Sequence, residues 1–477
     1  MKIRSPQYDS ALAVLRALER HGHTCWFVGG CVRDAVLAGI RPGADIVTTD
    51  TDLAASASPE QMMGVFAEYG WTVLPTGIQH GTLTVRPHAA PLHSIEVTTF
   101  RVDGGYSDGR HPDAVTFTGS IDDDLSRRDF TINAMAWHPE RGLLDPYGGR
   151  DGLEQQLIRT VGEPDRRFSE DALRMLRAIR FAAKLGFSIE DGTWEAIRAH
   201  ARDISKVAHE RCASELTQII RSPRPEALRT LRDAGLLSCL LPEIDILFDP
   251  ETGAQRNPHH VHTVGEHTVR VMQNVPPDPA LRLTAMLHDA GKPLCRRPHV
   301  SDGRDTFYGH PQASERIAKD VLKRLCVSKP LRERILPLIR YHDTVPEPDD
   351  AYALKRLLYK MSGAGGAETG AALFSDWAAF KRADILGQNP DMHAEKLERL
   401  DRLKALSERV LREGQPYSLS QLAINGSDVA ALGISGPAVG QALGVCLHAV
   451  MRDPGKNNRE ALLRLAARFA KTGKKKI

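Results

Sequence analysis

The N-terminal fold is decided by one stretch of sequence, Trp26-Phe27-Val28-Gly29-Gly30-Cys31-Val32-Arg33-Asp34. Its apolar start predicts a buried strand, the paired glycines predict a turn, and a helix should begin at about Val32. A helix with one apolar face is expected before this stretch, and strand patterns continue after it to about residue 140. This part of the chain is therefore predicted to form an α/β head.

Three carboxylates of the head are candidates for metal binding. Asp50 and Asp52 are two residues apart in an expected strand, so their side chains should point to the same face. Glu96 lies in a second expected strand with alternating β-branched residues. A D-x-D pair alone is more often a solvated loop, but three converging carboxylates can hold two Mg2+ ions against a nucleoside triphosphate. Asp50, Asp52 and Glu96 are therefore the expected catalytic residues and metal ligands.

A group of acidic, basic and amide side chains follows at residues 123–133. Arg127 and Arg128 suit the oxygens of a triphosphate, because guanidinium groups form bidentate, charge-assisted hydrogen bonds. Asn133 could hold the ribose or the strand, and Asp129 lies between these groups. We expect all four residues to belong to a nucleotide-binding site.

A third polar block begins a helix predicted over residues 170–184, with Ser169 as its N-cap. Asp171 and Arg174, three residues apart, should share one face of this helix. A carboxylate acceptor beside a guanidinium donor can hydrogen-bond the edge of a base. The alternative is a surface ion pair between the two side chains, which is their commoner role on a helix.

The same predicted helix carries two further arginines, Arg177 and Arg180, interleaved with apolar residues. One flank of the helix should therefore face the core, and the other flank should be cationic. We expect the cationic flank to bind a triphosphate or an RNA backbone.

Six of these stretches follow one another in order, at residues 29–34, 50–52, 76–82, 96–101, 127–133 and 170–174. In this order they resemble the class II tRNA nucleotidyltransferase and poly(A) polymerase family. The resemblance implies that Gly29, Gly30 and Arg33 also take part in nucleotide binding. It further implies that Asp171 and Arg174 select CTP and ATP by protein contacts alone.

The chain departs from the family pattern between Asp34 and Asp50, where residues 37–47 make the spacing longer and leave Asp45 as an alternative member of the carboxylate pair. Residues 101–112 are rich in glycine and polar side chains, so we expect a mobile loop there. The resemblance gives this loop a part in the switch from CTP to ATP. Its full length argues against an enzyme that adds only CC.

A second site is expected in the middle of the chain, mostly on predicted helices. Its expected metal ligands are His267, His288, Asp289, His310, His342 and Asp343. Their order resembles the metal site of an HD domain, and such ligands suit Mg2+, Mn2+, Ni2+ or Fe. A bound metal can activate water against a phosphate ester, which predicts a phosphatase or phosphodiesterase activity. The alternative is a set of core histidines without metal, and the nearby histidines at 259, 260 and 262 receive no role.

Length and composition set wider bounds. The 477 residues, with 42% hydrophobic and 26% charged side chains, are typical of a globular protein of several domains. The net charge is only +3, so a tRNA surface must come from local clusters of Lys and Arg. The seven cysteines show no C-x-x-C spacing and are expected to be reduced. No signal region or membrane-spanning run is visible, so we expect a cytoplasmic protein without membrane contact.

The expected fold class is an α/β nucleotidyltransferase head followed by all-α neck, HD and tail domains. The expected ranges are 8–140 for the head, 141–256 for the neck, 257–346 for the HD domain and 347–477 for the tail, which is expected to contact tRNA. The leading functional hypothesis is CCA addition, in which the tRNA 3′ end attacks CTP or ATP. The alternatives are a poly(A) polymerase, an HD phosphohydrolase with a nucleotide-binding head, and an RNA-binding scaffold.

Overall fold

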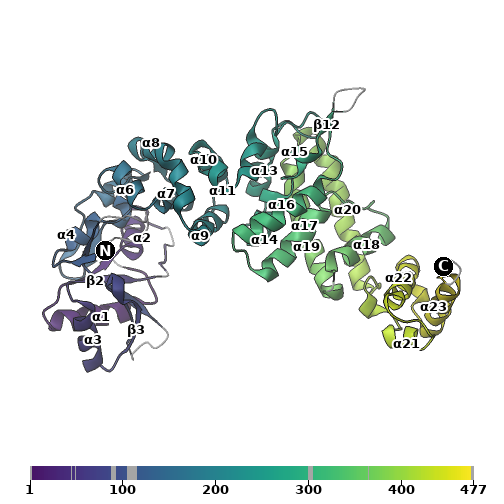
Figure 1. The fold of residues 1–477 in the computed structure, drawn as a ribbon, viewed down its shortest axis with the longest axis horizontal. Helices are drawn as coiled ribbons and strands as arrows, with labels where there is room; N and C mark the ends of the chain where they lie inside the picture. Colours follow the sequence, from purple (N-terminus) through teal and green to yellow (C-terminus); the bar gives the residue numbers. More distant parts are fainter. Residues whose placement is uncertain are drawn as a thin grey trace. The chain divides into compact units, whose positions relative to one another are not determined.

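The computed structural model describes residues 3–43, 46–48, 50–87, 93–104, 115–298, 304–363 and 365–473. The chain forms two compact units, Met1–Leu240 and Leu241–Ile477, coloured purple to teal and green to yellow in Figure 1. The first unit combines a sheet with helices, and the second is almost entirely helical. The expected fold class, an α/β head followed by helical regions, is confirmed.

The first unit is built on a seven-stranded sheet with strand order β3-β4-β5-β2-β1-β8-β9. Its strands are β1 (Cys25–Val28), β2 (Asp52–Ala55), β3 (Thr72–Gly77), β4 (Thr82–Arg86), β5 (Ile95–Thr99), β8 (Ala136–His138) and β9 (Gly142–Leu144). Only β2 and β5 pair in parallel; the other neighbours in this sheet are antiparallel. Short pairs are formed by β6 (Arg101–Asp103) with β7 (Val115–Phe117), and by β10 (Leu157–Ile158) with β11 (Ser188–Ile189).

Helices cover the sheet and continue the unit beyond it. They are α1 (Tyr8–Arg20), α2 (Gly30–Ile40), α3 (Pro59–Glu68), α4 (Ile121–Ser126), α5 (Gly149–Glu154), α6 (Pro164–Glu170), α7 (Leu173–Leu185), α8 (Asp191–His200), α9 (His209–Ile220), α10 (Ala227–Asp233) and α11 (Leu236–Leu240). A core under the sheet joins β1, β2 and β8 through Val28, Ala54 and Ala136, together with Phe100 and Leu125. The glycine turn predicted after β1 is present, but α2 begins at Gly30 and not at Val32.

The helix predicted over 170–184 is present as α7 from Leu173 onward, but its predicted start is wrong, because the chain breaks at Asp171 between α6 and α7. The backbone of Asp171 is extended, with φ −150° and ψ 103°. Ser169 lies inside α6 and donates a hydrogen bond to the carbonyl of Asp165, so it is not an N-cap. Asp171 instead accepts a hydrogen bond from the backbone of Leu173, which starts α7.

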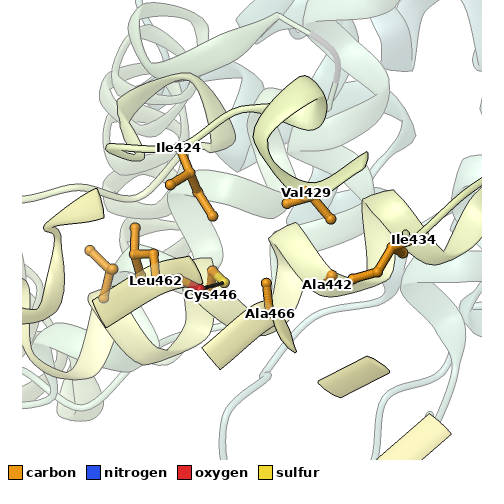
Figure 2. Packing of buried hydrophobic residues seen from close by; sticks show 8 residues of the cluster. Ile424, Val429, Ile434, Ala442, Cys446, Leu462 and Ala466 are labelled. Atoms are coloured by element: carbon orange, nitrogen blue, oxygen red, sulfur yellow. Dashed lines mark hydrogen bonds between the residues drawn. The ribbon is translucent and has the colours of Figure 1, made fainter. Parts of the chain in front are cut away.

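The second unit packs helices around α13 and α17. Its elements are α12 (Pro242–Asp245), α13 (Val264–Asn274), α14 (Pro279–Leu287), α15 (Lys292–Cys295), α16 (His310–Arg324), α17 (Lys329–Tyr341), α18 (Ala351–Ser362), α19 (Gly366–Leu386), α20 (His393–Arg412), α21 (Gly426–Ala430), α22 (Pro437–Arg452) and α23 (Arg459–Gly473), with the short strands β12 (Arg297–Pro298) and β13 (Asp305–Thr306). Helix α13 packs on α14 and α19, while α17 packs on α14 and α16. Figure 2 shows a separate small core in α21–α23 and the adjoining turns, where Val429, Ala442, Cys446 and Leu462 meet.

Several expectations fall outside the described residues, namely Asp45 and most of the loop at 101–112. All seven cysteines are free, in agreement with the absence of a disulfide pattern. Among the described residues, no helix has both the length and the apolar character needed to cross a bilayer.

Candidate functional site

The three predicted carboxylates meet at the parallel pair of strands. Asp52 opens β2 and lies opposite Glu96 of β5 in the strand register. Asp50 precedes β2, so the expectation that it shares a strand with Asp52 is wrong. Burial raises the pKa of Asp52 to about 6, and the negative charges of Glu96 and Asp50 add to this effect while Arg128 opposes it. Mutually repelling carboxylates of this kind form an oxygen donor set that suits a hard divalent cation.

A cavity of about 660 Å³ opens beside Asp52. Thirteen of the predicted residues line it, namely Gly29, Gly30, Arg33, Asp50, Asp52, Arg127, Arg128, Asp129, Asn133, Asp171, Arg174, Arg177 and Arg180. Glu96 does not line the cavity, although its charge acts on Asp52. Asp34, Phe181, Lys184 and Arg211 also line it, and the sequence analysis gave none of them a role. Residues from α2, β2, α7 and α9, and from the segments that follow β1 and α4, therefore converge on one site.

The glycine turn allows these groups to approach one another. Gly29 has φ +73°, and a β-carbon there would lie 3.2 Å from Nη1 of Arg128 and 3.7 Å from Oδ2 of Asp52. A side chain at this position would therefore be strained and would press on the groups that face the cavity. One turn into α2, Arg33 donates a 2.9 Å hydrogen bond to Oδ1 of Asn133.

Asp129 ties α7 to the head. Its Oδ1 accepts hydrogen bonds from the Phe130 backbone at 2.8 Å and from Asn133 at 3.1 Å. Its Oδ2 accepts two from Arg177, at 2.8 and 2.6 Å. Burial alone would raise the pKa of Asp129, but the charge of Arg177 and these hydrogen bonds outweigh it and lower the pKa to about 2. Asp129 is thus an ionised anchor whose oxygens are engaged within the protein.

The hydrogen-bond network of Asp129 predicts that the free energy of unfolding decreases at acidic pH. A depressed folded pKa stabilises the fold above the unfolded pKa of about 4, and the contribution of about 2 kcal/mol is lost as the pH falls towards 2. In urea titrations at pH 2 to 6, Asp129→Asn should be less stable than wild type at pH 6 and should lose less stability on acidification. Tryptophan fluorescence reports mainly on the first unit, which holds Trp26, Trp71, Trp137 and Trp194. The same loss of stability on acidification in Asp129→Asn and wild type would contradict this expectation. Asp151 is exposed, so the control Asp151→Asn should behave as wild type.

Three guanidinium groups surround the ring of Phe181, one of the apolar residues of α7. Arg33, Arg177 and Arg180 lie 5.2, 5.6 and 4.1 Å from its centroid. Arg180 also donates a 2.5 Å hydrogen bond to Glu215 of α9. The aromatic ring therefore holds a cationic wall, which suits a polyanionic ligand such as a triphosphate.

Asp171 and Arg174 both line the cavity, but they are not paired with each other as the sequence alternative supposed. Arg211 of α9 donates to both carboxylate oxygens of Asp171, at 2.7 and 3.3 Å. Arg174 donates to Glu170 at 2.6 Å and to the carbonyl of Arg127 at 3.3 Å. The break at Asp171 also means that the two residues do not share a helix face. Each is held separately at the cavity wall.

A second cluster lies in the second unit, at the ends of several helices. His267 is on α13, His288 and Asp289 follow α14, His310 begins α16 and His342 follows α17. The expectation that His288, Asp289, His342 and Asp343 lie within helices is therefore wrong, since they follow the helix ends. Asp384 of α19, which the sequence analysis missed, completes the cluster.

The geometry divides the cluster into two ligand groups, His267 with His288 and Asp384, and Asp289 with His310 and His342. Asp289 reaches both groups. Its Oδ2 lies 3.1 Å from Nε2 of His288, and its Oδ1 lies 3.2 Å from Nε2 of His310 and 3.5 Å from that of His342. On the other side, Oδ1 of Asp384 lies 3.1 Å from Nε2 of His267.

All four imidazoles face the cluster in the same way. Each Nδ1 lies at a backbone carbonyl: Gly387 for His267 at 3.1 Å, Ala285 for His288 at 2.9 Å, Phe307 for His310 at 2.9 Å and Ile339 for His342 at 2.7 Å. Nδ1–H therefore donates outward, and the Nε2 lone pair points inward, as in metal-binding histidines.

Several inward atoms lie 3.1 to 3.2 Å from polar neighbours but without the geometry of a hydrogen bond in the described chain. They are Nε2 of His267, Nε2 of His288 and Oδ1 of Asp289, all buried. Buried polar atoms are rarely left without a partner, so the donor set fits divalent metal ions. Asp343 is half exposed and lies at the rim, 3.5 Å from Nε2 of His310, outside both ligand groups. The expected ligand Asp343 therefore lies outside the two groups, and Asp384 lies inside one of them.

A cavity of about 830 Å³ leads to this cluster. Lys292 and Lys381 line it and form ion pairs with Asp289 at 2.7 Å and with Asp384 at 2.8 Å. His260, to which the sequence analysis gave no role, also lines the cavity, and its ring centroid lies 4.8 Å from that of His267. Cations beside clustered ligands suit an anionic substrate.

Comparison with known proteins agrees with this arrangement. Residues 25–159 match the family model described as "Poly A polymerase head domain". Residues 186–247 match "Probable RNA and SrmB- binding site of polymerase A", and residues 259–365 match "HD domain".

The chain carries the regions that these three models describe, and it resembles the class II tRNA nucleotidyltransferase and poly(A) polymerase family.

Curated members of this family are close in sequence over about half of the chain. A CCA-adding enzyme of Geobacillus thermodenitrificans is 43% identical over 236 residues, 49% of this chain and 55% of that protein. One of Latilactobacillus sakei is 42% identical over 233 residues, 49% of this chain and 55% of that protein. The chain thus spans about half the length of the curated relatives it matches.

Solved structures of family members extend the likeness to the whole fold. The Bacillus stearothermophilus CCA-adding enzyme in complex with CTP has a TM-score of 0.69 and 27% identity, with 100% of both chains covered. The Thermotoga maritima CCA-adding enzyme complexed with tRNA has a TM-score of 0.58 and 18% identity, with 98% of this chain and 96% of that chain covered. The second match carries information on the fold alone.

Proposed function

We propose that the chain is a CCA-adding tRNA nucleotidyltransferase, which transfers CMP and AMP from CTP and ATP to the tRNA 3′ end. The observation that carries the proposal is the cavity in which Asp50 and Asp52, the cationic wall and the pair Asp171 and Arg174 meet. The 43% identity to a CCA-adding enzyme supports it. A phosphohydrolase alone would not require this head site.

Each group of the cavity has a role in the proposed transfer. Mg2+ held by Asp50, Asp52 and Glu96 would neutralise the triphosphate and lower the pKa of the attacking 3′ hydroxyl. Arg33, Arg177 and Arg180 around Phe181, together with Arg127 and Arg128, would orient the phosphates. Asn133 would steady Arg33 and the ribose, and Asp129 would keep Arg177 in place. Gly29 and Gly30 keep the turn beside Asp52 free of side chains.

The pair Asp171 and Arg174 would read the base. Cytosine and adenine both offer an amino group on the edge where uracil and guanine offer a carbonyl oxygen. A carboxylate accepts from the amino group and is repelled by the carbonyl oxygen. Arg174 would donate to the neighbouring ring acceptor of either base, so one protein pair can serve both CTP and ATP.

The test is the product formed on a tRNA transcript that ends at the discriminator base, incubated with Mg2+, CTP and ATP. Sequencing of the 3′ ends should show growth by C-C-A and then arrest. Arrest after C-C would indicate that a partner enzyme adds the final A, and long A tails would establish a poly(A) polymerase. No growth would overturn the proposal for the head.

We propose a second function for the HD cluster, hydrolysis of a phosphate ester. Two adjacent ligand groups, one of which contains Asp289 and the other of which Asp289 contacts through His288, favour this function. Mg2+, Mn2+ or Ni2+ ions bound there would polarise the ester and lower the pKa of attacking water. Lys292 and Lys381 would balance the carboxylates and hold the phosphate.

The division into head, neck, HD domain and tail at residues 8–140, 141–256, 257–346 and 347–477 is part of the proposal. Helix α19 would join the HD part, since it carries Asp384. The tail would contact tRNA through basic side chains gathered on α18 and α22. Arg356 and Arg452 lie 5.6 and 4.8 Å from the ring centroid of Tyr352. Together with Lys360, they lower the pKa of His448 beyond the effect of its burial.

Charge reversal on this surface should weaken tRNA binding. Arg356→Glu/Arg452→Glu should raise the Kd for tRNA at least about tenfold at low salt and reduce the salt slope by about two, because two phosphate contacts are removed. Filter binding at several salt concentrations measures both quantities. The matched control, Arg402→Glu/Arg464→Glu, reverses two exposed arginines that pair with Asp349 and Glu460. Equal losses in the two double variants would exclude a specific contact.

A further inference from the structure

The carboxylate of Asp171 has one main anchor, and that anchor comes from another helix. The backbone of Asp171 is extended, so no helix fixes its side chain. Within its own segment it accepts only from the backbone of Leu173, at 3.1 Å. Arg211 of α9 spans both carboxylate oxygens, at 2.7 and 3.3 Å. The direction of the Asp171 carboxylate is therefore set by Arg211.

Arg211 does not stabilise α9, the helix on which it lies. It lies in the first turn of α9 (His209–Ile220), where a cation opposes the helix dipole. One turn later on the same face, Glu215 accepts a 2.5 Å hydrogen bond from Arg180 and lies 3.9 Å from Arg177. Helix α9 thus presents two charged side chains to the polar groups of α7 and its N-terminal junction.

Arg174, the other expected base contact, is held independently of Arg211. Its Nη1 donates to Glu170 and to the carbonyl of Arg167, at 2.6 and 3.2 Å. Removal of Arg211 would therefore release one half of the base-reading pair and leave the other half in place. Each carboxylate oxygen can accept two hydrogen bonds, so Arg211 leaves acceptor capacity on Asp171 for a ligand in the cavity.

We infer that Arg211 is a specificity-positioning residue of the transfer site. It orients the Asp171 carboxylate so that the cavity binds bases with an amino group on the edge that faces Asp171 and excludes bases with a carbonyl oxygen there. This inference rests on the proposed nucleotidyl transfer. Without Arg211 the carboxylate keeps only the hydrogen bond from Leu173, its direction is less restricted, and it repels the carbonyl oxygens of uracil and guanine less strongly.

The experiment compares Arg211→Met, which keeps length and removes the donors, with Arg211→Lys, which keeps the charge. Single-nucleotide addition to tRNA transcripts is measured with CTP against UTP, and with ATP against GTP. The ratio of kcat/KM for CTP over UTP should fall at least about tenfold in Arg211→Met, which corresponds to the loss of about one hydrogen bond. Arg211→Lys should recover part of this ratio. The matched control is Arg198→Met, an exposed arginine of α8 that pairs with Glu195.

The outcomes separate positioning from other roles. Lower discrimination in Arg211→Met with an unchanged thermal midpoint of unfolding supports the inference. An equal rise in KM for all four nucleotides would overturn it, because Arg211 would then act as a general anion contact. Unchanged discrimination, or the same loss in Arg198→Met, would also overturn it. If wild-type protein adds no nucleotide at all, the proposed transfer itself fails.

Discussion

Asp52→Asn should reduce the rate of nucleotide addition by about a thousandfold or more, because asparagine keeps the shape of the side chain but removes the charge that a metal needs. Burial and the negative charges of Glu96 and Asp50 raise the pKa of Asp52. The cationic wall around Phe181 remains, so the affinity for CTP should change by less than about tenfold. A single-turnover assay at saturating CTP measures the rate, and equilibrium dialysis without Mg2+ measures the affinity.

Exposed Asp151→Asn on α5 is the matched control and should retain full activity. Glu96→Asn should also lose activity, since Glu96 lies opposite Asp52 in the register. A rate within about tenfold of wild type for Asp52→Asn would mean that the metal is held elsewhere in the cavity.

Asp289→Asn should lower the affinity of the HD cluster for both metal ions by roughly a hundredfold or more, because Asp289 contacts both ligand groups. Mass spectrometry of protein loaded with Mn2+ and then dialysed counts the bound ions. The count is made in an Asp52→Asn background, so that the head contributes none. We expect two ions with an intact cluster, none after Asp289→Asn and one after Asp384→Asn.

Asp343→Asn is the informative control, since sequence order proposed Asp343 as a ligand and the geometry places it at the rim. It should keep both ions. In chains with an intact head, Asp289→Asn should leave CMP and AMP addition unchanged, which separates the two proposed functions. A single ion in the intact cluster would contradict the shared role of Asp289.

The local pattern of the sequence was enough to predict much of the head. Two glycines after an apolar run require a turn, and thirteen residues chosen from short motifs line one cavity. The break at Asp171 could not be predicted, because the apolar spacing around it is helical and its partner Arg211 is forty residues away. Asp384 was missed for a similar reason, since it lies on a long helix outside the predicted HD segment. Phe181 fits an apolar core in sequence, and only the three surrounding arginines give it another role.

The parallel pairing of β2 with β5 makes the head's chemistry dependent on its core. Asp52 and Glu96 are opposite each other only after the chain has passed through α3, β3 and β4, and a slip of one residue would turn Glu96 to the other face. Ile95 and Val97 flank Glu96 and are fully buried, so a slip would expose them. Burial of these two apolar side chains thus fixes the register of β5 with β2. Substitutions that weaken their packing would impair transfer without changing any group that contacts the nucleotide.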